Sequence, residues 1–138
     1  MYCLTIANID IIIGQTISIF VIKGEEMSRE KFKTLTEQMF YILLCLHNEC
    51  CGTDIMSKVS DMTDGRVRIG PGTLYNLLDQ FAETGLIIET RTEGRKRSYI
   101  LTEKGEKLLR DEYDRILLQI RDYDAAQNAA QKEGKLRA

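Results

Sequence analysis

Cysteine and histidine side chains cluster near the end of the first predicted helix. Cys45, His47, Cys50 and Cys51 bring thiols and one imidazole into a short segment, and such groups bind thiophilic metals or undergo reversible oxidation. Their spacing matches no standard zinc pattern, and cysteine is also a common buried residue. We therefore expect packing in the core and in a turn, with a thiol- or metal-responsive site as the alternative.

The sequence does not favour an enzyme. His47 is the only histidine of the chain, so a Ser-His-Asp or Cys-His catalytic arrangement would have to use it. The chain also lacks a phosphate-loop motif and a dinucleotide-binding glycine pattern. We expect no catalytic residues, no cofactor and no enzymatic activity.

The segment RIGPGTLYNLLDQFAETGLI, from Arg68 to Ile87, predicts a helix with two contrasting faces. Helical spacing predicts that its apolar face is buried: Leu74, Leu77, Leu78 and Phe81. Pro71 suits the first helical turn and Gly85 suits the C-terminal cap. The bare backbone at Gly70 and Gly72, together with the N–H groups and dipole of the helix start, favours an anion such as a phosphate.

The opposite face of this helix carries hydrogen-bonding side chains. Thr73 and Tyr75 can bind phosphate, and Asn76 can read an adenine edge, bind phosphate or bind water. A predicted hairpin follows, and its tip is basic: Arg95, Lys96 and Arg97, with Arg91 nearby. Polar helix faces and charged turns usually only face solvent. A basic tip beside a phosphate-binding helix start, however, predicts one nucleic-acid footprint.

Two further short helices precede this one. The first is predicted over about 34–47 and starts with the capping-box pattern Thr34-x-x-Glu37. After a turn, Thr53 or Asp54 is expected to cap the second, which ends by Gly65. The apolar face of the second helix is formed by Ile55, Met56, Val59 and Met62.

The predicted order is three short helices, two strands and a long helix that Thr102 caps. Each short helix can bury only one stripe, so the three must pack together with the hairpin closing one edge. We therefore predict a mainly α fold with a small β-hairpin, in which a winged helix-turn-helix domain precedes a long C-terminal dimerisation helix. The expected boundaries are 27–102 for the DNA-binding domain, 103–130 for the dimerisation helix and 131–138 for a flexible tail.

The long helix carries an apolar seam. Its members follow the spacing 4, 3, 4, 3, with Leu117 beside them: Leu109, Tyr113, Ile116, Ile120 and Tyr123. This heptad-like pattern predicts dimerisation, and two joined units would address two DNA half-sites. The alternative is a helix that folds back on its own domain.

The first 26 residues form a different kind of segment. Ile11 to Ile22 is apolar and β-branched, but too short to span a bilayer, and it lacks the features of a signal peptide. Lys23 to Met27 can be encoded by purine-rich codons that resemble a bacterial ribosome-binding site before a start codon. Residues 1–26 are thus expected to be a leader upstream of the true start at Met27, or else an extra strand or disordered arm.

Charge and cysteine content bear on the partners of the chain and on its cellular compartment. Its net charge is −2, yet the segment from Arg66 to Arg97 is locally basic, which is sufficient for phosphate binding. Adjacent Cys50 and Cys51 suit no regular disulfide framework, and no secretion signal precedes them. We expect a cytoplasmic protein with no membrane partner.

These motifs together resemble the PadR family of bacterial transcriptional regulators. The resemblance covers about 34–124, and its most specific parts are GPGTLY (70–75), ExGLI (83–87), the basic hairpin tip and YxLTxxG (99–105). The chain departs from the family at Asn48 to Gly52, where the family often has a His- or Gly-rich turn. The resemblance implies a dimeric winged-helix repressor that contacts DNA through Pro71, Thr73, Tyr75, Asn76 and Arg95 to Arg97. Gly72 joins this set as a backbone contact, and Lys58 on the second helix is expected to bind phosphate.

The function expected from sequence is sequence-specific binding of double-stranded DNA by a homodimer. It would repress its own or a neighbouring operon and be released by a small-molecule effector. Two alternatives stay open: a thiol- or metal-responsive regulator that uses the cysteine cluster, and a winged-helix module that binds protein.

Overall fold

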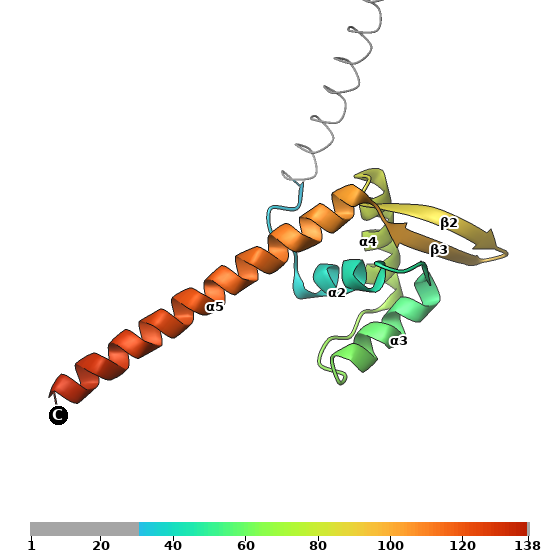
Figure 1. Cartoon of the computed structure of the whole chain (residues 1–138). Coiled ribbons are helices and arrows are strands. Elements are labelled where there is room, and N and C mark those ends of the chain that lie inside the picture. Colours follow the sequence, from blue (N-terminus) through green and yellow to red (C-terminus); the bar gives the residue numbers. More distant parts are fainter. Residues whose placement is uncertain (1–30, 138) are drawn as a thin grey trace, which may run out of the picture.

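The computed structural model describes residues 31–137. Its elements are α2 (Glu37–Cys45), β1 (Cys50–Cys51), α3 (Gly52–Met62), α4 (Pro71–Glu83), β2 (Ile87–Glu93), β3 (Lys96–Leu101) and α5 (Glu103–Arg137). Three short helices pack together beside a small sheet, and α5 projects from this domain as a long rod (Figure 1). The predictions for residues 1–26 lie outside the described residues.

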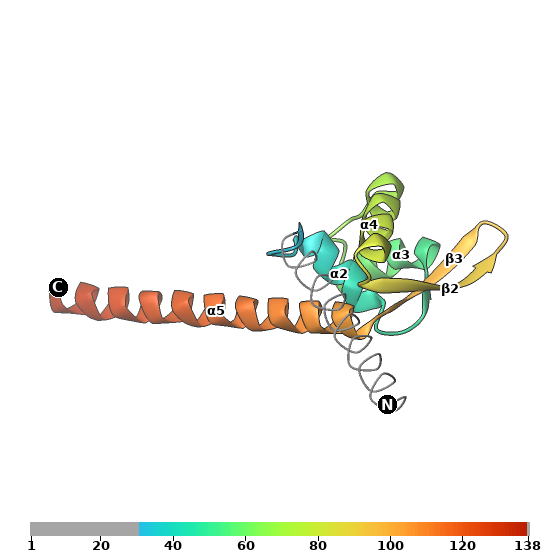
Figure 2. The ribbon, with the colours of Figure 1, turned by 90° about the horizontal axis from the view of Figure 1, so that it is seen from above.

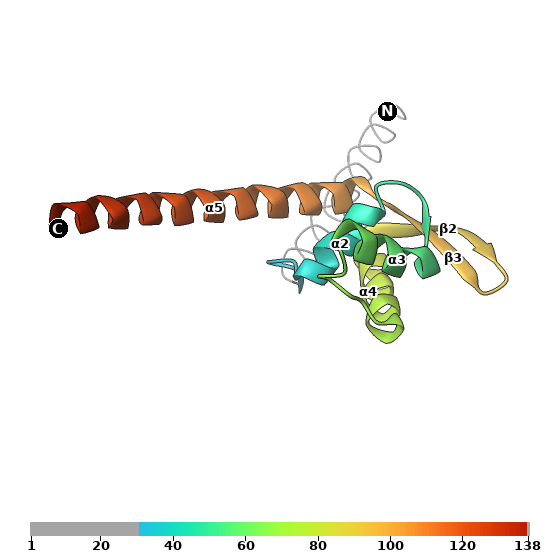
Figure 3. The ribbon, with the colours of Figure 1, turned by 90° about the horizontal axis from the view of Figure 1, so that it is seen from below.

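The structure confirms the predicted fold class. Helices α2, α3 and α4 precede the β2–β3 hairpin, as expected for a winged helix-turn-helix. Views from above and below show the hairpin and α5 projecting in opposite directions from the helices (Figures 2 and 3).

The wing is the small sheet built on the β2–β3 hairpin, and it has one strand more than the sequence predicts. Residues 50 and 51 form the short strand β1, which pairs antiparallel with β3 and gives the strand order β1-β3-β2. Cys50 lies opposite Tyr99, and Cys51 lies opposite Ser98. The sequence indicates only a turn here, because two residues carry no alternation and their partners are distant in the chain.

Two predicted helix starts are wrong. Helix α2 begins at Glu37 rather than near Thr34, and the side chain of its N-cap Thr36 accepts a hydrogen bond from the Met39 N–H (3.3 Å). Helix α3 begins at Gly52, and its N-cap is Cys51 rather than Thr53 or Asp54. In the second case tertiary pairing decides, because β1 holds Cys51 in an extended conformation immediately before the helix.

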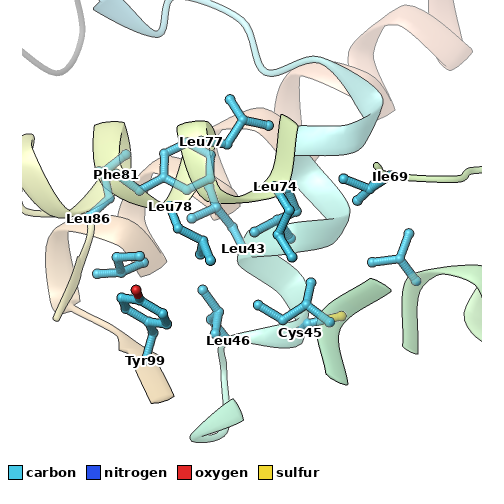
Figure 4. Packing of buried hydrophobic residues seen from close by; sticks show 14 of the residues in the cluster. Leu43, Cys45, Leu46, Ile69, Leu74, Leu77, Leu78, Phe81, Leu86 and Tyr99 are labelled. Atoms are coloured by element: carbon cyan, nitrogen blue, oxygen red, sulfur yellow. The ribbon is translucent and has the colours of Figure 1, made fainter. Parts of the chain in front are cut away.

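The predicted apolar face of α4 forms the centre of the core. Leu74, Leu78 and Phe81 are fully buried, and Leu77 is almost so. Leu74 and Leu78 point toward Leu43 and Leu46 of the α2 region, whereas Leu77 lies on the other side of α4 (Figure 4). On α3 the predicted face is shorter than expected, because Ile55 and Val59 are buried whereas Met62 is half exposed.

The end of α4 and the start of α5 meet in one tight junction. Gly85 adopts a positive φ of 75°, as its predicted capping role requires, and the Leu86 N–H bonds back to the Phe81 carbonyl (2.9 Å). Thr102 caps α5 as predicted, since its Oγ1 accepts from the Gly105 N–H (3.1 Å). A Cβ at Gly105 would lie 2.1 Å from the Leu86 carbonyl oxygen, so only glycine fits.

Helix α5 runs further than the sequence predicts. It continues to Arg137, through most of the segment expected to be a tail. Ala129, Ala130 and Lys132 are good helix formers. The basic residues of the last turn, Lys135 and Arg137, favour the negative end of the helix dipole.

Substitution of Gly105 by alanine is expected to destabilise the protein by about 1–3 kcal/mol, because the new methyl group must displace the Leu86 backbone. Gly134→Ala is the matched control. It lies in the same helix with no atom within 4 Å of its Cβ position, and it should stabilise by up to about 1 kcal/mol. Urea unfolding measures both values. Equal effects of the two substitutions would contradict the close approach of Gly105 to the Leu86 carbonyl.

Stability is expected to fall in acid partly through Glu112. Hydrogen bonds from Arg115 and from the Leu35 backbone N–H lower the pKa of this buried carboxyl. Because the folded pKa lies below the unfolded one, the contact stabilises the fold above the ordinary glutamate pKa and is lost as pH falls through the folded pKa.

The free energy of unfolding should therefore fall less steeply between about pH 6 and pH 3 in Glu112→Gln than in the parent chain. Glu133→Gln, at an exposed position of the same helix, serves as control and should follow the parent profile. Parallel profiles for parent and Glu112→Gln would rule out this contribution.

Candidate nucleic-acid interface

The start of α4 offers free backbone N–H groups on the surface. Gly70 is the N-cap, Pro71 occupies the first turn, and no side chain of the described residues caps this end. Positions 70–73 are exposed, and a Cβ at Gly70 or Gly72 would meet nothing within 4 Å. Packing therefore does not require these glycines, and the helix start is open to an external acceptor.

The polar face of α4 is exposed as predicted. Thr73 and Asn76 are exposed, and Tyr75 is 39% exposed. The Tyr75 ring also lies over the first residue of α3, since its Cε1 is 3.3 Å from the Cβ position of Gly52. Tyr75 thus connects the starts of α3 and α4.

Alternation along β3 divides the basic tip between two faces of the wing. Arg97 and the buried Tyr99 share one face. Burial raises the pKa of Tyr99. Lys96 lies on the other face, where it lines a cavity of about 120 Å³ together with Cys51 and Arg91. Arg95, in the hairpin turn, is exposed like Lys96 and Arg97.

Lys58 is exposed on α3, but its ammonium group already has a partner within the protein. Its Nζ donates to Cys50 Sγ at 3.2 Å, and this hydrogen bond raises the pKa of Lys58. A phosphate contact at this position would therefore compete with the Cys50 contact.

Two basic residues missed as individual sites lie in the loop between α3 and α4. Arg68 is exposed just before α4, and its carbonyl accepts from Gln38 Nε2 (3.0 Å). Arg66 bonds Glu37 and donates to the Tyr41 hydroxyl (3.0 Å), so it ties the loop to α2. The sequence shows that this segment is locally basic, but it does not show that Arg66 and Arg68 lie beside the polar start of α4.

The cysteine–histidine cluster is divided among different partners. His47 Nδ1 lies 3.4 Å from Glu106 Oε1, Cys50 contacts Lys58, and Cys51 Sγ lies 3.3 Å from Thr53 Oγ1. Cys45 is buried, which raises the pKa of its thiol. Over residues 31–137 no group of three or more His, Cys, Asp or Glu side chains is placed to hold a metal ion.

The apolar seam of α5 is largely uncovered by its own domain. Tyr113, Ile120 and Tyr123 are more than half exposed, Leu117 is 41% exposed, and Ile116 is half-buried. Leu109 is the exception, because it is buried in the core and is not available to a partner. Leu118, absent from the predicted seam, is also exposed.

Solved structures share this fold. A PadR family transcriptional regulator from Eggerthella lenta is 16% identical, with a TM-score of 0.57, and the match covers 85% of this chain and 96% of that chain. A transcriptional regulator from Clostridium thermocellum is 22% identical, with a TM-score of 0.57 and coverages of 64% and 87%. The DNA-binding protein Sso10a-2 from Sulfolobus solfataricus is 24% identical, with a TM-score of 0.56 and coverages of 69% and 90%.

Sequence comparison identifies the family. No curated protein matches the chain. In the described part, no helix is long and apolar enough to cross a membrane. The model of the transcriptional regulator PadR-like family matches residues 42–111, which is half of the chain and runs from α2 into α5. The chain therefore belongs to the PadR-like family, whose members are transcriptional regulators and not enzymes, in agreement with the sequence-based prediction.

Proposed function

We propose that this transcriptional regulator is a dimeric repressor that binds specific sites in double-stranded DNA. One observation carries the proposal: the open, uncapped start of α4 is exposed in the same domain as a basic wing. In helix-turn-helix proteins the second helix of the motif enters the major groove by its N-terminal residues. Here that helix is α4.

The proposed DNA contacts follow from the exposed groups. The backbone of Gly72 and the hydroxyl of Thr73 bind a phosphate at the helix start. Asn76, further along the exposed face, reads a base edge. Arg95, Lys96 and Arg97 bind flanking phosphates through the wing.

The uncovered seam of α5 supports a second copy as partner. Apolar side chains such as Ile120 and Tyr123 line one helix that projects away from its own domain (Figure 1). A dimer would cover them and present two copies of α4 to two half-sites. In this proposal the protein represses its own or a neighbouring operon until a small-molecule effector releases it. Cavities of about 400 and 510 Å³ between α2 and α5 are the candidate effector space, and Phe40 and Tyr113 line both.

The first test is binding to the protein's own upstream DNA at two salt concentrations. Binding should weaken with salt, and replacement of Arg95, Lys96 and Arg97 by alanine should lower affinity at least tenfold. The triple variant should also reduce the slope of log affinity against log salt by up to about 3 per protomer. Electrophoretic mobility shift or fluorescence anisotropy measures both.

The matched control removes the same charge at the far end of α5, by alanine at Lys132, Lys135 and Arg137. This control should bind like the parent chain. If the two triple variants bind equally well, the wing is not a DNA contact. If the parent chain binds neither its upstream DNA nor any sequence from a random selection at low salt, the DNA-binding proposal is rejected. The alternative of a winged-helix module that binds protein then takes its place.

Dimerisation is tested by alanine at Ile116 and Ile120 together. Loss of two apolar side chains from the seam should convert the dimer to monomers at micromolar concentration and weaken operator binding. Light scattering measures the mass, and circular dichroism checks the fold. Leu136→Ala, at an apolar residue outside the seam, is the control and should remain dimeric. An unchanged dimer in the double variant would refute this seam.

A further inference from the structure

The loop between α3 and α4 presents one arginine to solvent on an anchored stretch of backbone. Arg68 is exposed, whereas its neighbours Val67 and Ile69 are only 5% and 6% exposed and belong to the core. Two hydrogen bonds add to this anchoring. The Val67 N–H donates to Thr63 Oγ1 (3.1 Å), and the Arg68 carbonyl accepts from Gln38 Nε2 of α2 (3.0 Å). The backbone that carries Arg68 is therefore held on both sides.

Arg68 differs from Arg66, the other arginine of this loop, in what its guanidinium group contacts. Arg66 forms an ion pair with Glu37 and donates to the Tyr41 hydroxyl at 3.0 Å. In the part of the chain that the structure describes, the Arg68 side chain has no ion pair and no hydrogen bond. Arg68 thus carries a positive charge that the described part of the protein does not neutralise.

This charge lies close to the open start of α4. Arg68 is two residues before Gly70, the N-cap of α4. Two residues span at most about 7 Å, so the Cα atoms of Arg68 and Gly70 lie within that distance of each other. Successive phosphates of one DNA strand are about 3.4 Å apart along the helix axis. A phosphate at the start of α4 would thus bring a neighbouring phosphate of the same strand within reach of the Arg68 side chain.

The loop and the wing lie on opposite sides of α4. In each view the loop reaches the start of α4 from the side of α2, and the wing projects on the other side (Figures 1, 2 and 3). A helix that enters the major groove, which is about 12 Å wide, has a phosphate backbone on each side of it. Contacts to both backbones fix the register and orientation of the helix. The wing supplies such contacts on one side only.

We infer that Arg68 binds a DNA phosphate on the wall of the major groove opposite the wall that the wing binds. This inference rests on the proposed function and names a contact that the function needs on the second wall. Arg66 makes no such contact, because its guanidinium group holds the loop on α2. The DNA-binding surface then has three parts in a row, which are the loop at Arg68, the start of α4 and the wing.

The first experiment compares Arg68→Gln with the parent chain, both at full length, on a duplex that the parent chain selects from random sequence. Loss of one phosphate contact should reduce the slope of log affinity against log salt by about 1 per protomer. Affinity at low salt should fall at least about threefold, and by the same factor on an unrelated duplex, since a phosphate contact carries no sequence information. Arg68→Lys keeps the charge and should retain the parent slope.

Arg66→Gln is the matched control, because it removes the same group from the same loop, and it should keep the parent slope. Lys132→Gln removes one charge from the far part of α5 and should also keep it. Thermal unfolding identifies a variant that fails to fold, and Arg68→Ala then replaces Arg68→Gln.

Two results of this experiment would overturn the inference and leave the proposed function in place. One is a folded Arg68 variant with the same slope as Arg66→Gln. The other is a loss of affinity that depends on the base at one position of the site, because Arg68 would then read a base and not a phosphate. Absence of DNA binding by the parent chain would instead overturn the proposed function.

A second readout locates the phosphate. Single phosphates around each half-site are replaced, one at a time, by neutral methylphosphonates. At the phosphate that Arg68 binds, the parent chain should lose at least about threefold in affinity, and Arg68→Gln should lose nothing further. The triple alanine variant of Arg95, Lys96 and Arg97 should become insensitive at phosphates on the other wall of the groove. Insensitivity of both variants at the same phosphates would overturn the inference.

Discussion

The carbonyl group of Leu86 is the point on which the arrangement of this protein depends. It accepts hydrogen bonds from the backbone N–H and the hydroxyl of Thr102, and it lies where a Cβ at Gly105 would have to sit. One oxygen thus joins the turn after α4, the end of β3 and the start of α5. This junction therefore brings the end of β3 and the start of α5 directly against the turn after α4.

The helices of this protein differ in whether a side chain caps their start. Threonine side chains cap α2 and α5. Helices α3 and α4 begin at Cys51 and Gly70, and neither start receives a side-chain cap from the described residues. Uncapped N–H groups destabilise an isolated helix, but they can donate hydrogen bonds to an external anion that binds at the helix start. The two uncapped starts are connected through Tyr75 and Gly52, which suits a shared surface for DNA backbone.

Polar contacts tie the loop between α3 and α4 to α2. Arg66 holds the loop before α4 on α2 through Glu37 and Tyr41, and Gln38 holds the carbonyl of Arg68. The apolar core supplies most of the stability, and these directional contacts hold the loop in front of α4 against α2.

Local sequence alone determined the elements whose signals are short-range. The stripe from Leu74 to Phe81, the Gly85 cap, the hairpin with its basic tip and the cap at Thr102 all follow from residue type and spacing, and together they indicate the winged-helix fold. Only the tertiary structure decided β1, the helix start at Gly52, the burial of Leu109 and the partners of His47, Cys50 and Lys58. Each of these depends on a contact between residues distant in the chain, and periodicity carries no information about such contacts. The partners of Arg66 and the burial of Glu112 could not be predicted for the same reason. A charged residue has the same appearance in a sequence whether it is exposed or buried.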